Sequence, residues 1–139
     1  MSNELQELGR AVKQAQYRQH RTLDSALSAI GTTLAQWDAL RAISRAPGAS
    51  ARELAAATFQ TEQAFGTLVR RLTAQGVAER RPGHGRRIEH HLTPEGERLL
   101  AAGHKIADEV LAACFAPLPE PDRATLLALL RRLTAEEPT

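Results

Sequence analysis

The chain has 139 residues, a length typical of one domain, and 42% of them are hydrophobic, which suffices for a packed core. No apolar run approaches the roughly 18 residues of a membrane span, and the first residues lack the pattern of a secretory signal, so we expect no membrane association and a cytoplasmic location. The net charge of +2 excludes a uniformly basic chain, but residues 61–92 hold six arginines against three acidic residues, whereas residues 93–139 are net acidic.

Two helices are predicted first. Apolar residues recur at helical spacing from about residue 4 to residue 30, where Gly31 ends the pattern. Thr33 begins a second helix over about residues 34–45 as part of a capping box, and a Pro-Gly pair then breaks the chain. The N-terminal third of the protein is therefore expected to be helical.

Two shorter helices follow, with a tight turn between them. Ser50 and Glu53 form a capping box for a helix that reaches about Ala57. Thr61 is the expected N-cap of the next helix, which continues to about Gln75. This spacing is typical of a helix-turn-helix.

The second short helix has two distinct faces. Its apolar residues follow the i, i+3, i+4, i+7 rule and are expected to face the core; they are Phe65, Leu68, Val69 and Leu72. Gln63, Thr67 and Arg70 lie on the opposite face. Glutamine and arginine form bidentate hydrogen bonds with adenine and guanine edges, so this face suits the reading of bases in duplex DNA.

The helical spacing of apolar residues ends after this helix, and the pattern that follows indicates a β-hairpin. Residues 77–81 and 86–92 form short segments on either side of a Pro-Gly-His-Gly turn. A helix follows from the N-cap Thr93 to about Phe115, and a last helix covers about residues 122–133. The expected fold is mainly α with a small β-wing, in which a winged helix-turn-helix lobe accompanies a helical dimerisation region.

Residues 54–80 and the stretch Leu92-Thr93-Pro94-Glu95-Gly96 resemble the MarR-type (multiple antibiotic resistance regulator) transcriptional regulators, and the likeness extends over nearly the whole chain. The resemblance implies a homodimer whose first, fifth and sixth helices intertwine. It also implies a recognition helix at about 61–75 and a wing at 77–92.

On this basis the chain is expected to be one MarR-like domain, 1–139. Residues 1–31 and 94–139 would form the dimerisation region, and residues 33–92 the DNA-binding lobe.

The candidate DNA-binding residues come from the recognition helix and the wing, and they are Thr61, Gln63, Thr67, Arg70, Arg86 and Arg87. The alternative for the arginines is a solvated charged surface. Wings of this family commonly carry Asp-x-Arg near the tip, whereas this chain reads His84-Gly85-Arg86. The arginine is present without its acidic partner, which would leave its orientation less restrained.

A second candidate site lies on the first two helices. Tyr17, His20 and Arg21 are spaced to share a helix face with Asp24, and Trp37 follows in the next helix. Similar regulators often bind small aromatic acids between the dimerisation region and the lobe, so a small aromatic or phenolic effector is a candidate partner. The alternative is simple packing with a few salt bridges.

No cofactor or metal ion is expected. Cys114 cannot form an intrachain disulfide, and within its apolar run a small buried hydrophobic side chain is the expected role. His90 and His91 are adjacent on a predicted strand and point to opposite faces, which does not favour a shared metal.

The sequence therefore predicts a sequence-specific, double-stranded DNA-binding transcriptional regulator that binds an inverted-repeat operator, and the resemblance implies that it is a ligand-responsive repressor. An enzyme is not expected, because the chain has no phosphate-binding glycine loop and no nucleophile elbow. A winged-helix module for protein interaction, without specific DNA binding, is the alternative.

Overall fold

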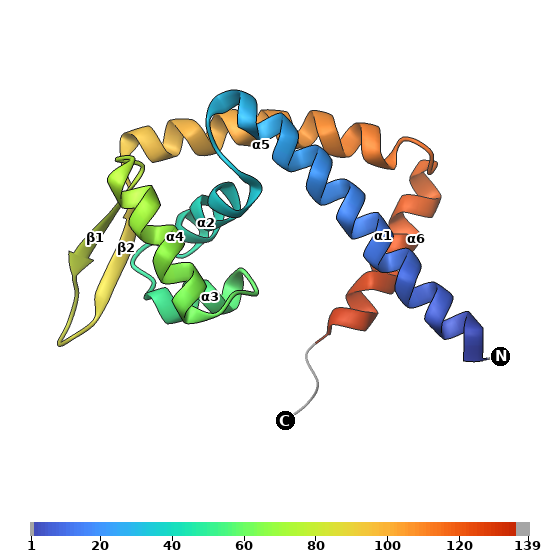
Figure 1. Cartoon of the computed structure of the whole chain (residues 1–139), viewed down its shortest axis with the longest axis horizontal. Helices are drawn as coiled ribbons and strands as arrows, with labels where there is room; N and C mark the ends of the chain where they lie inside the picture. Colours follow the sequence, from blue (N-terminus) through green and yellow to red (C-terminus); the bar gives the residue numbers. More distant parts are fainter. Residues whose placement is uncertain (1, 136–139) are drawn as a thin grey trace.

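The computed structural model describes residues 2–135 and consists of helices with one small antiparallel sheet (Figure 1). The elements are α1 (Ser2–Leu27), the 3-10 helix η1 (Ser28–Ile30), α2 (Leu34–Arg45), α3 (Ala51–Ala57), α4 (Glu62–Ala74), β1 (Ala78–Pro82), β2 (Ile88–Leu92), α5 (Pro94–Phe115) and α6 (Glu120–Thr134). The expected mainly α fold with a β-wing is confirmed.

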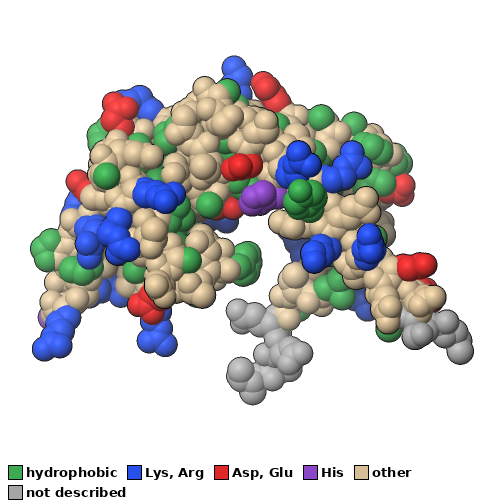
Figure 2. Space-filling view, in the orientation of Figure 1, with side chains coloured by type: hydrophobic (Ala, Val, Ile, Leu, Met, Phe, Trp, Pro, Cys, Tyr) green, Lys and Arg blue, Asp and Glu red, His purple; other side chains and the backbone are tan. Residues whose placement is uncertain are grey.

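The elements divide between the two ends of the long helix α5. In Figure 1, helices α2, α3 and α4 and the hairpin form a lobe at one end of α5, while α1 and α6 extend from the other end as an arm. The space-filling view shows the molecule hollowed between this lobe and this arm (Figure 2). The chain is thus shaped as an arch whose top is α5.

The core lies inside the lobe. The largest fully buried side chains include Leu40 and Ile43 of α2, Leu54 of α3, and Phe65 and Leu72 of α4. They meet because each helix presents one apolar stripe, and burying such a side chain contributes about 1.5–3 kcal/mol. The expected core-facing stripe of α4 is confirmed, with Leu68 only partly buried at its margin.

Helix α1 buries only one end of its apolar stripe within the single chain. Leu23 and Leu27 near its C-terminal end are buried, whereas Leu5, Leu8 and Val12 are exposed in the single chain. The N-terminal half of α1 extends beyond the lobe along the arm (Figure 1), so its apolar residues have no core to enter.

Helix α6 buries even less of its apolar surface within the single chain than α1 does. It begins before the predicted start, because prolines are tolerated in the first helical turn and Pro119 serves as its N-cap. None of its residues is buried, and its exposed apolar residues are Leu127, Leu129, Leu130 and Leu133. Cys114 near the end of α5 is also exposed, so the prediction of a buried cysteine is wrong for the single chain. The arm therefore presents unpartnered apolar surface.

Close packing between α2 and α5 joins the lobe to the top of the arch. The indole Nε1 of Trp37 donates a hydrogen bond to the carbonyl oxygen of Leu100, at 3.2 Å. A Cβ atom built on Gly103 would lie 2.1 Å from that Nε1, so the helices approach closely only because residue 103 has no side chain. This contact fixes the lobe against the middle of the arch.

Candidate nucleic-acid interface

The helix-turn-helix is held by hydrogen bonds encoded locally. The Ser50 hydroxyl accepts from the backbone N–H of Glu53, and the Glu53 carboxylate accepts from the Ser50 N–H, which confirms the predicted capping box of α3. Thr61 caps α4 by accepting from the Ala64 N–H at 3.1 Å. Phe59, in the turn between them, adopts a left-handed backbone with φ of 58°. These contacts fix where α3 and α4 begin.

The outer face of α4 carries the predicted base-reading residues. Gln63, Thr67 and Arg70 are all exposed, as is Thr61 at the cap. Arg70 Nη2 donates to Thr67 Oγ1 at 3.2 Å, and that hydroxyl donates to the Gln63 carbonyl oxygen at 3.3 Å. The three side chains thus lie in a row on one face of the helix.

The wing is a hairpin with a glycine-rich tip. Strands β1 and β2 pair from Ala78 with Leu92 to Pro82 with Ile88. Gly85 has φ of 65°, a conformation that favours glycine, and Gly83 N–H donates to the Arg87 carbonyl oxygen at 2.7 Å. Arg86 is exposed at this tip, and within residues 2–135 its side chain has no hydrogen bond or ion pair. Its guanidinium is available to an external anion.

Arg87, unlike Arg86, has hydrogen-bond partners within the lobe. Its Nη2 lies 2.7 Å from Glu53 Oε1 and donates to the Gly48 carbonyl oxygen at 3.0 Å. The pKa of Glu53 is lowered to about 2, first by the Ser50 N–H, then by the Ser50 hydroxyl and by Arg87. This carboxylate is therefore ionised at physiological pH, and Arg87 is already paired with it.

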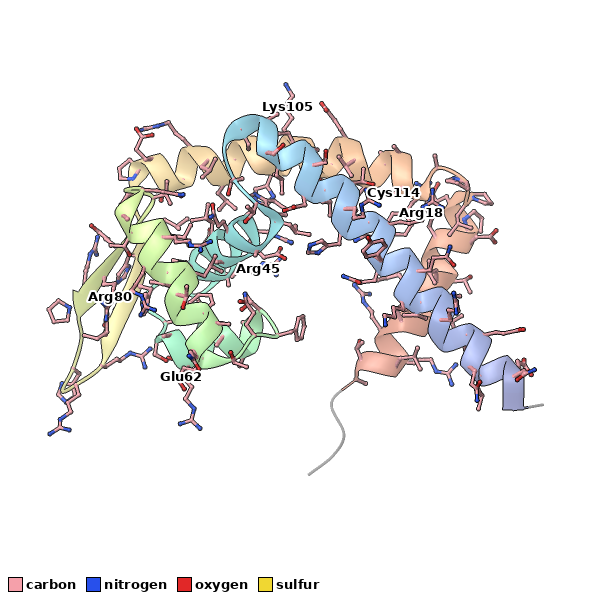
Figure 3. The ribbon with its side chains drawn as sticks, in the orientation of Figure 1. Arg18, Arg45, Glu62, Arg80, Lys105 and Cys114 are labelled. Carbon is pink, nitrogen blue, oxygen red and sulfur yellow. The ribbon has the colours of Figure 1, made fainter. Side chains whose placement is uncertain are left out.

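A cleft of about 300 Å³ separates α3 and α4 from the wing. We call it the recognition cleft, and the arginines that line it are Arg52, Arg70, Arg80, Arg86 and Arg87. Glu62 is the acidic residue along it. Figure 3 labels Arg80 on the wing and Glu62 at the start of α4, and Figure 2 shows basic side chains over this part of the lobe. The clustered guanidinium groups create a positive surface suited to phosphates.

Sequence reasoning missed two of these residues. Arg52 follows Ser50 in the capping box, and Arg80 belongs to the basic run that precedes the hairpin turn. The signal for Arg80 was the concentration of arginines in residues 61–92. Arg52 carried no such signal, because only the fold brings α3 to the wing.

A second cleft, of about 480 Å³, lies between α1, α2 and α5, and we call it the effector cleft. Its lining includes His20, Trp37, Asp38, Arg41 and His104. The Arg41 guanidinium lies 4.7 Å from the Trp37 ring centroid, and its Nη1 lies 3.5 Å from Asp38 Oδ1. His104 meets the indole edge-on at 5.3 Å between ring centroids.

Polar groups in the effector cleft are only partly satisfied. The Arg41 Nε is buried and has no hydrogen-bond partner among the described residues. Burial raises the pKa of Asp38, and the nearby Arg41 opposes this shift. An aromatic wall beside the Arg41 cation suits a small aromatic anion.

The residues predicted for the effector do not all meet. His20 and Trp37 line the effector cleft, but Tyr17 and Arg21 line a separate depression on α1, where the guanidinium carbon lies 5.7 Å from the tyrosine ring centroid. Successive helix residues point about 100° apart, so Arg21 diverges from His20. Asp24 instead accepts from the Leu34 N–H at 2.8 Å and stabilises the start of α2.

Neither a metal site nor a membrane-spanning helix is found among the described residues. Among residues 2–135, no three histidine, cysteine, aspartate or glutamate side chains are grouped so that they could hold a metal ion. None of the helices in this range combines the length and apolarity needed to cross a bilayer.

Comparison with known proteins gives a consistent picture. The model of one protein family, described as the MarR family, matches residues 30–88. The HTH-type transcriptional repressor Rv2887 of Mycobacterium tuberculosis is 30% identical over 116 residues, covering 82% of this chain and 84% of that protein. The crystal structure of Rv2887 with salicylic acid is 29% identical, with a TM-score of 0.75 over 91% of this chain and 95% of that one. A cysteine-to-serine mutant of MarR from E. coli in complex with operator DNA is 25% identical, with a TM-score of 0.88 over 96% of this chain and 97% of that one.

Proposed function

Because the chain belongs to the MarR family, we propose that it is a ligand-responsive transcriptional repressor that acts in the cytoplasm by binding an inverted-repeat operator as a homodimer. The observation that carries this proposal is the recognition cleft, where the exposed polar row on α4 is flanked by arginines of α3 and the wing. Such a surface can place α4 in the major groove while the wing reaches neighbouring phosphates.

The homodimer is supported by the arm. Helix α6 has no buried residue, and Leu5 and Leu8 of α1 are exposed. A second copy would cover these apolar surfaces, and it would place two copies of α4 about one helical turn of DNA apart, roughly 10 base pairs. In this proposal residues 1–31 and 94–139 form the dimerisation region and residues 33–92 the DNA-binding lobe.

The effector cleft supports a response to a small aromatic acid. Rv2887 has been crystallised with salicylic acid and with p-aminosalicylic acid. In this chain a carboxylate would pair with Arg41, and the ring would lie near Trp37 and His104. Because the cleft joins α1 of the arm and α5 at the top of the arch to α2 of the lobe, a bound ligand would favour one lobe orientation and shift the spacing of the two recognition helices.

Arg70 and Arg86 should fail in different ways when each is replaced by alanine. Arg70→Ala is expected to cost about 1–3 kcal/mol of binding free energy on the best operator and little on random duplex, because its contact is to a base.

Arg86→Ala is expected to weaken binding to both duplexes similarly and to lower the magnitude of the salt slope by about 2 per dimer, because its contact is to phosphates. Fluorescence anisotropy over a series of salt concentrations, on an operator selected from a random pool, measures both.

Equal losses on both duplexes for Arg70→Ala would reassign that residue to a phosphate. An unchanged salt slope for Arg86→Ala would mean that the wing does not touch the duplex. If the parent protein selects no sequence and shows no salt-dependent binding, the protein-interaction module becomes the better explanation.

Salicylate binding should depend on Arg41. Arg41→Met keeps an unbranched apolar side chain but removes the charged group that lies over Trp37, and it is expected to weaken salicylate binding by about 10-fold or more, the effect of losing a hydrogen bond to a charged group. Isothermal titration calorimetry measures the change. Arg18→Met, on the same depression of α1 as Tyr17, is the matched control and should bind like the parent. Equal binding by parent and Arg41→Met would exclude this cleft as the salicylate site.

A further inference from the structure

We propose that Arg87 is a positioning residue that fastens the wing to the start of α3, and that it does not contact DNA. The inference rests on the proposed function, because it concerns how the wing is presented to the operator. It reverses the sequence-based expectation for Arg87, since the structure places its guanidinium inside the lobe's own network of hydrogen bonds.

The Arg87 side chain joins three segments. Its Nη2 lies 2.7 Å from Glu53 Oε1 and donates to the Gly48 carbonyl oxygen at 3.0 Å. The same Glu53 Oε1 accepts from the Ser50 N–H at 3.0 Å. One carboxylate oxygen thus holds the first turn of α3 and the wing together, and one guanidinium holds α3 and the preceding loop.

Backbone hydrogen bonds hold the base of the wing at the same loop. Gly48 N–H donates to the His90 carbonyl oxygen at 2.9 Å, and His90 N–H donates to the Ala49 carbonyl oxygen at 3.1 Å. The buried His90 ring is also in hydrogen-bonding distance of that Ala49 oxygen, at 2.9 Å. Arg87 lies three residues nearer the tip than His90. Its side chain therefore extends the attachment from the base of β2 toward the tip.

The attachment leaves Arg86 available. Arg86 precedes Arg87 within the turn at the wing tip, and among residues 2–135 its side chain makes no hydrogen bond or ion pair while Arg87 is held against α3. The family's usual wing aspartate would restrain this arginine directly, but position 84 is histidine. Restraint of the backbone through Arg87 is a physical substitute for that missing side-chain contact.

Charge favours a positioning role over a phosphate contact. Arg87 is paired with an ionised carboxylate, so the pair brings no net positive charge to the duplex. A phosphate approaching Arg87 would also approach Glu53. Removing the Glu53 charge should therefore weaken operator binding if Arg87 positions the wing, and tighten it if Arg87 contacts a phosphate.

The test compares Arg87→Met, Glu53→Gln and the double variant in operator affinity and salt slope. Glutamine retains the capping-box hydrogen bond, so α3 keeps its N-terminus. We expect each single variant to weaken operator binding by about two- to fivefold, the range of coupling measured for exposed ion pairs. The double variant should be no weaker than Arg87→Met, and the salt slope should not change.

The matched control is the exposed pair Glu79 and Arg81, which lies within β1 and joins the wing to no other element. Arg81→Met should not show the combination expected of Arg87→Met, which is weaker operator binding with an unchanged salt slope. If Arg87→Met instead lowers the magnitude of the salt slope by about 2 per dimer and Glu53→Gln tightens binding, Arg87 contacts DNA and the proposal is wrong.

Hydrogen exchange of the free protein provides a readout that needs no DNA. Wing amides in residues 78–92 should exchange faster in Arg87→Met, while amides of α2 and α5 keep the parental rates. Unchanged exchange rates in the wing would show that Arg87 does not hold the wing against α3. Failure of the parent protein to bind any operator would leave this result standing and would count against the proposed function alone.

Discussion

Replacing Leu130 with glutamate is expected to convert the proposed dimer into a monomer near 15.2 kDa and to abolish operator binding at concentrations where the parent is saturated. Leu130 is 38% exposed and lies among the exposed leucines of α6. By two-fold symmetry the substitution places two charges in one apolar interface, where each lost leucine removes about 1.5–3 kcal/mol and each buried charge adds a larger cost. Light scattering measures the mass, and gel shift measures the binding.

Two comparisons make this result specific. Leu130→Met preserves volume and apolarity and should remain dimeric. Lobe stability, followed by hydrogen exchange of α2 and α4, should be unaffected by Leu130→Glu, because α6 contributes no buried residue to the lobe. A Leu130→Glu protein that keeps twice the chain mass would show that α6 does not form the interface.

Gly103→Ala is expected to lower stability by about 2–3 kcal/mol, a drop in Tm of roughly 6–12 °C. A Cβ at this position would lie 2.1 Å from Trp37 Nε1 and 2.3 Å from Cδ1, both in a rigid ring. Either the indole or α5 must move, and the hydrogen bond from Trp37 to Leu100 is then strained or lost. Thermal unfolding followed by circular dichroism measures the shift.

The control uses the same substitution in open space. Gly9 lies in α1, and in the single chain an added Cβ there would have nothing within 4 Å, so Gly9→Ala should not destabilise the lobe, and the helix propensity of alanine favours α1. If Gly103→Ala proved as stable as Gly9→Ala, the contact between α2 and α5 would be looser than the structure indicates. The effector cleft, which includes Trp37, should lose salicylate affinity in Gly103→Ala but not in Gly9→Ala.

Local hydrogen bonding explains why much of the fold could be predicted from sequence. The caps at Ser50, Thr61 and Thr93 occur as expected, because each is a contact between residues three apart in the chain. Thr33 also caps its helix through the Gln36 N–H, but the second half of its predicted capping box is absent, because the Gln36 Oε1 accepts from the Thr32 hydroxyl. Gly31 ends the first helical segment in a left-handed conformation, also as expected. Such features depend on neighbours that the sequence itself specifies.

Contacts between distant segments could not be predicted in this way. Arg87 and Glu53 were assigned separately, one to DNA and the other to a cap, and only the packing of the wing on α3 joins them. Similarly, the helical spacing grouped Tyr17 with His20, but the direction of α1 across α2 and α5 leaves Tyr17 57% exposed. Periodicity identifies a face of a helix without identifying what that face meets.

Trp37 gives the protein a built-in optical reporter. It is the only tryptophan in the sequence, and its indole lies against the Arg41 guanidinium and the His104 imidazole on the wall of the effector cleft. Indole emission depends on the groups that surround the ring, so a ligand that draws Arg41 away from Trp37 would change the fluorescence signal. The recognition cleft contains no tryptophan, and DNA binding would therefore affect this signal only by altering the lobe's position against α5. Ligand occupancy and its transmission to DNA can thus be followed separately, without a label, in one cuvette.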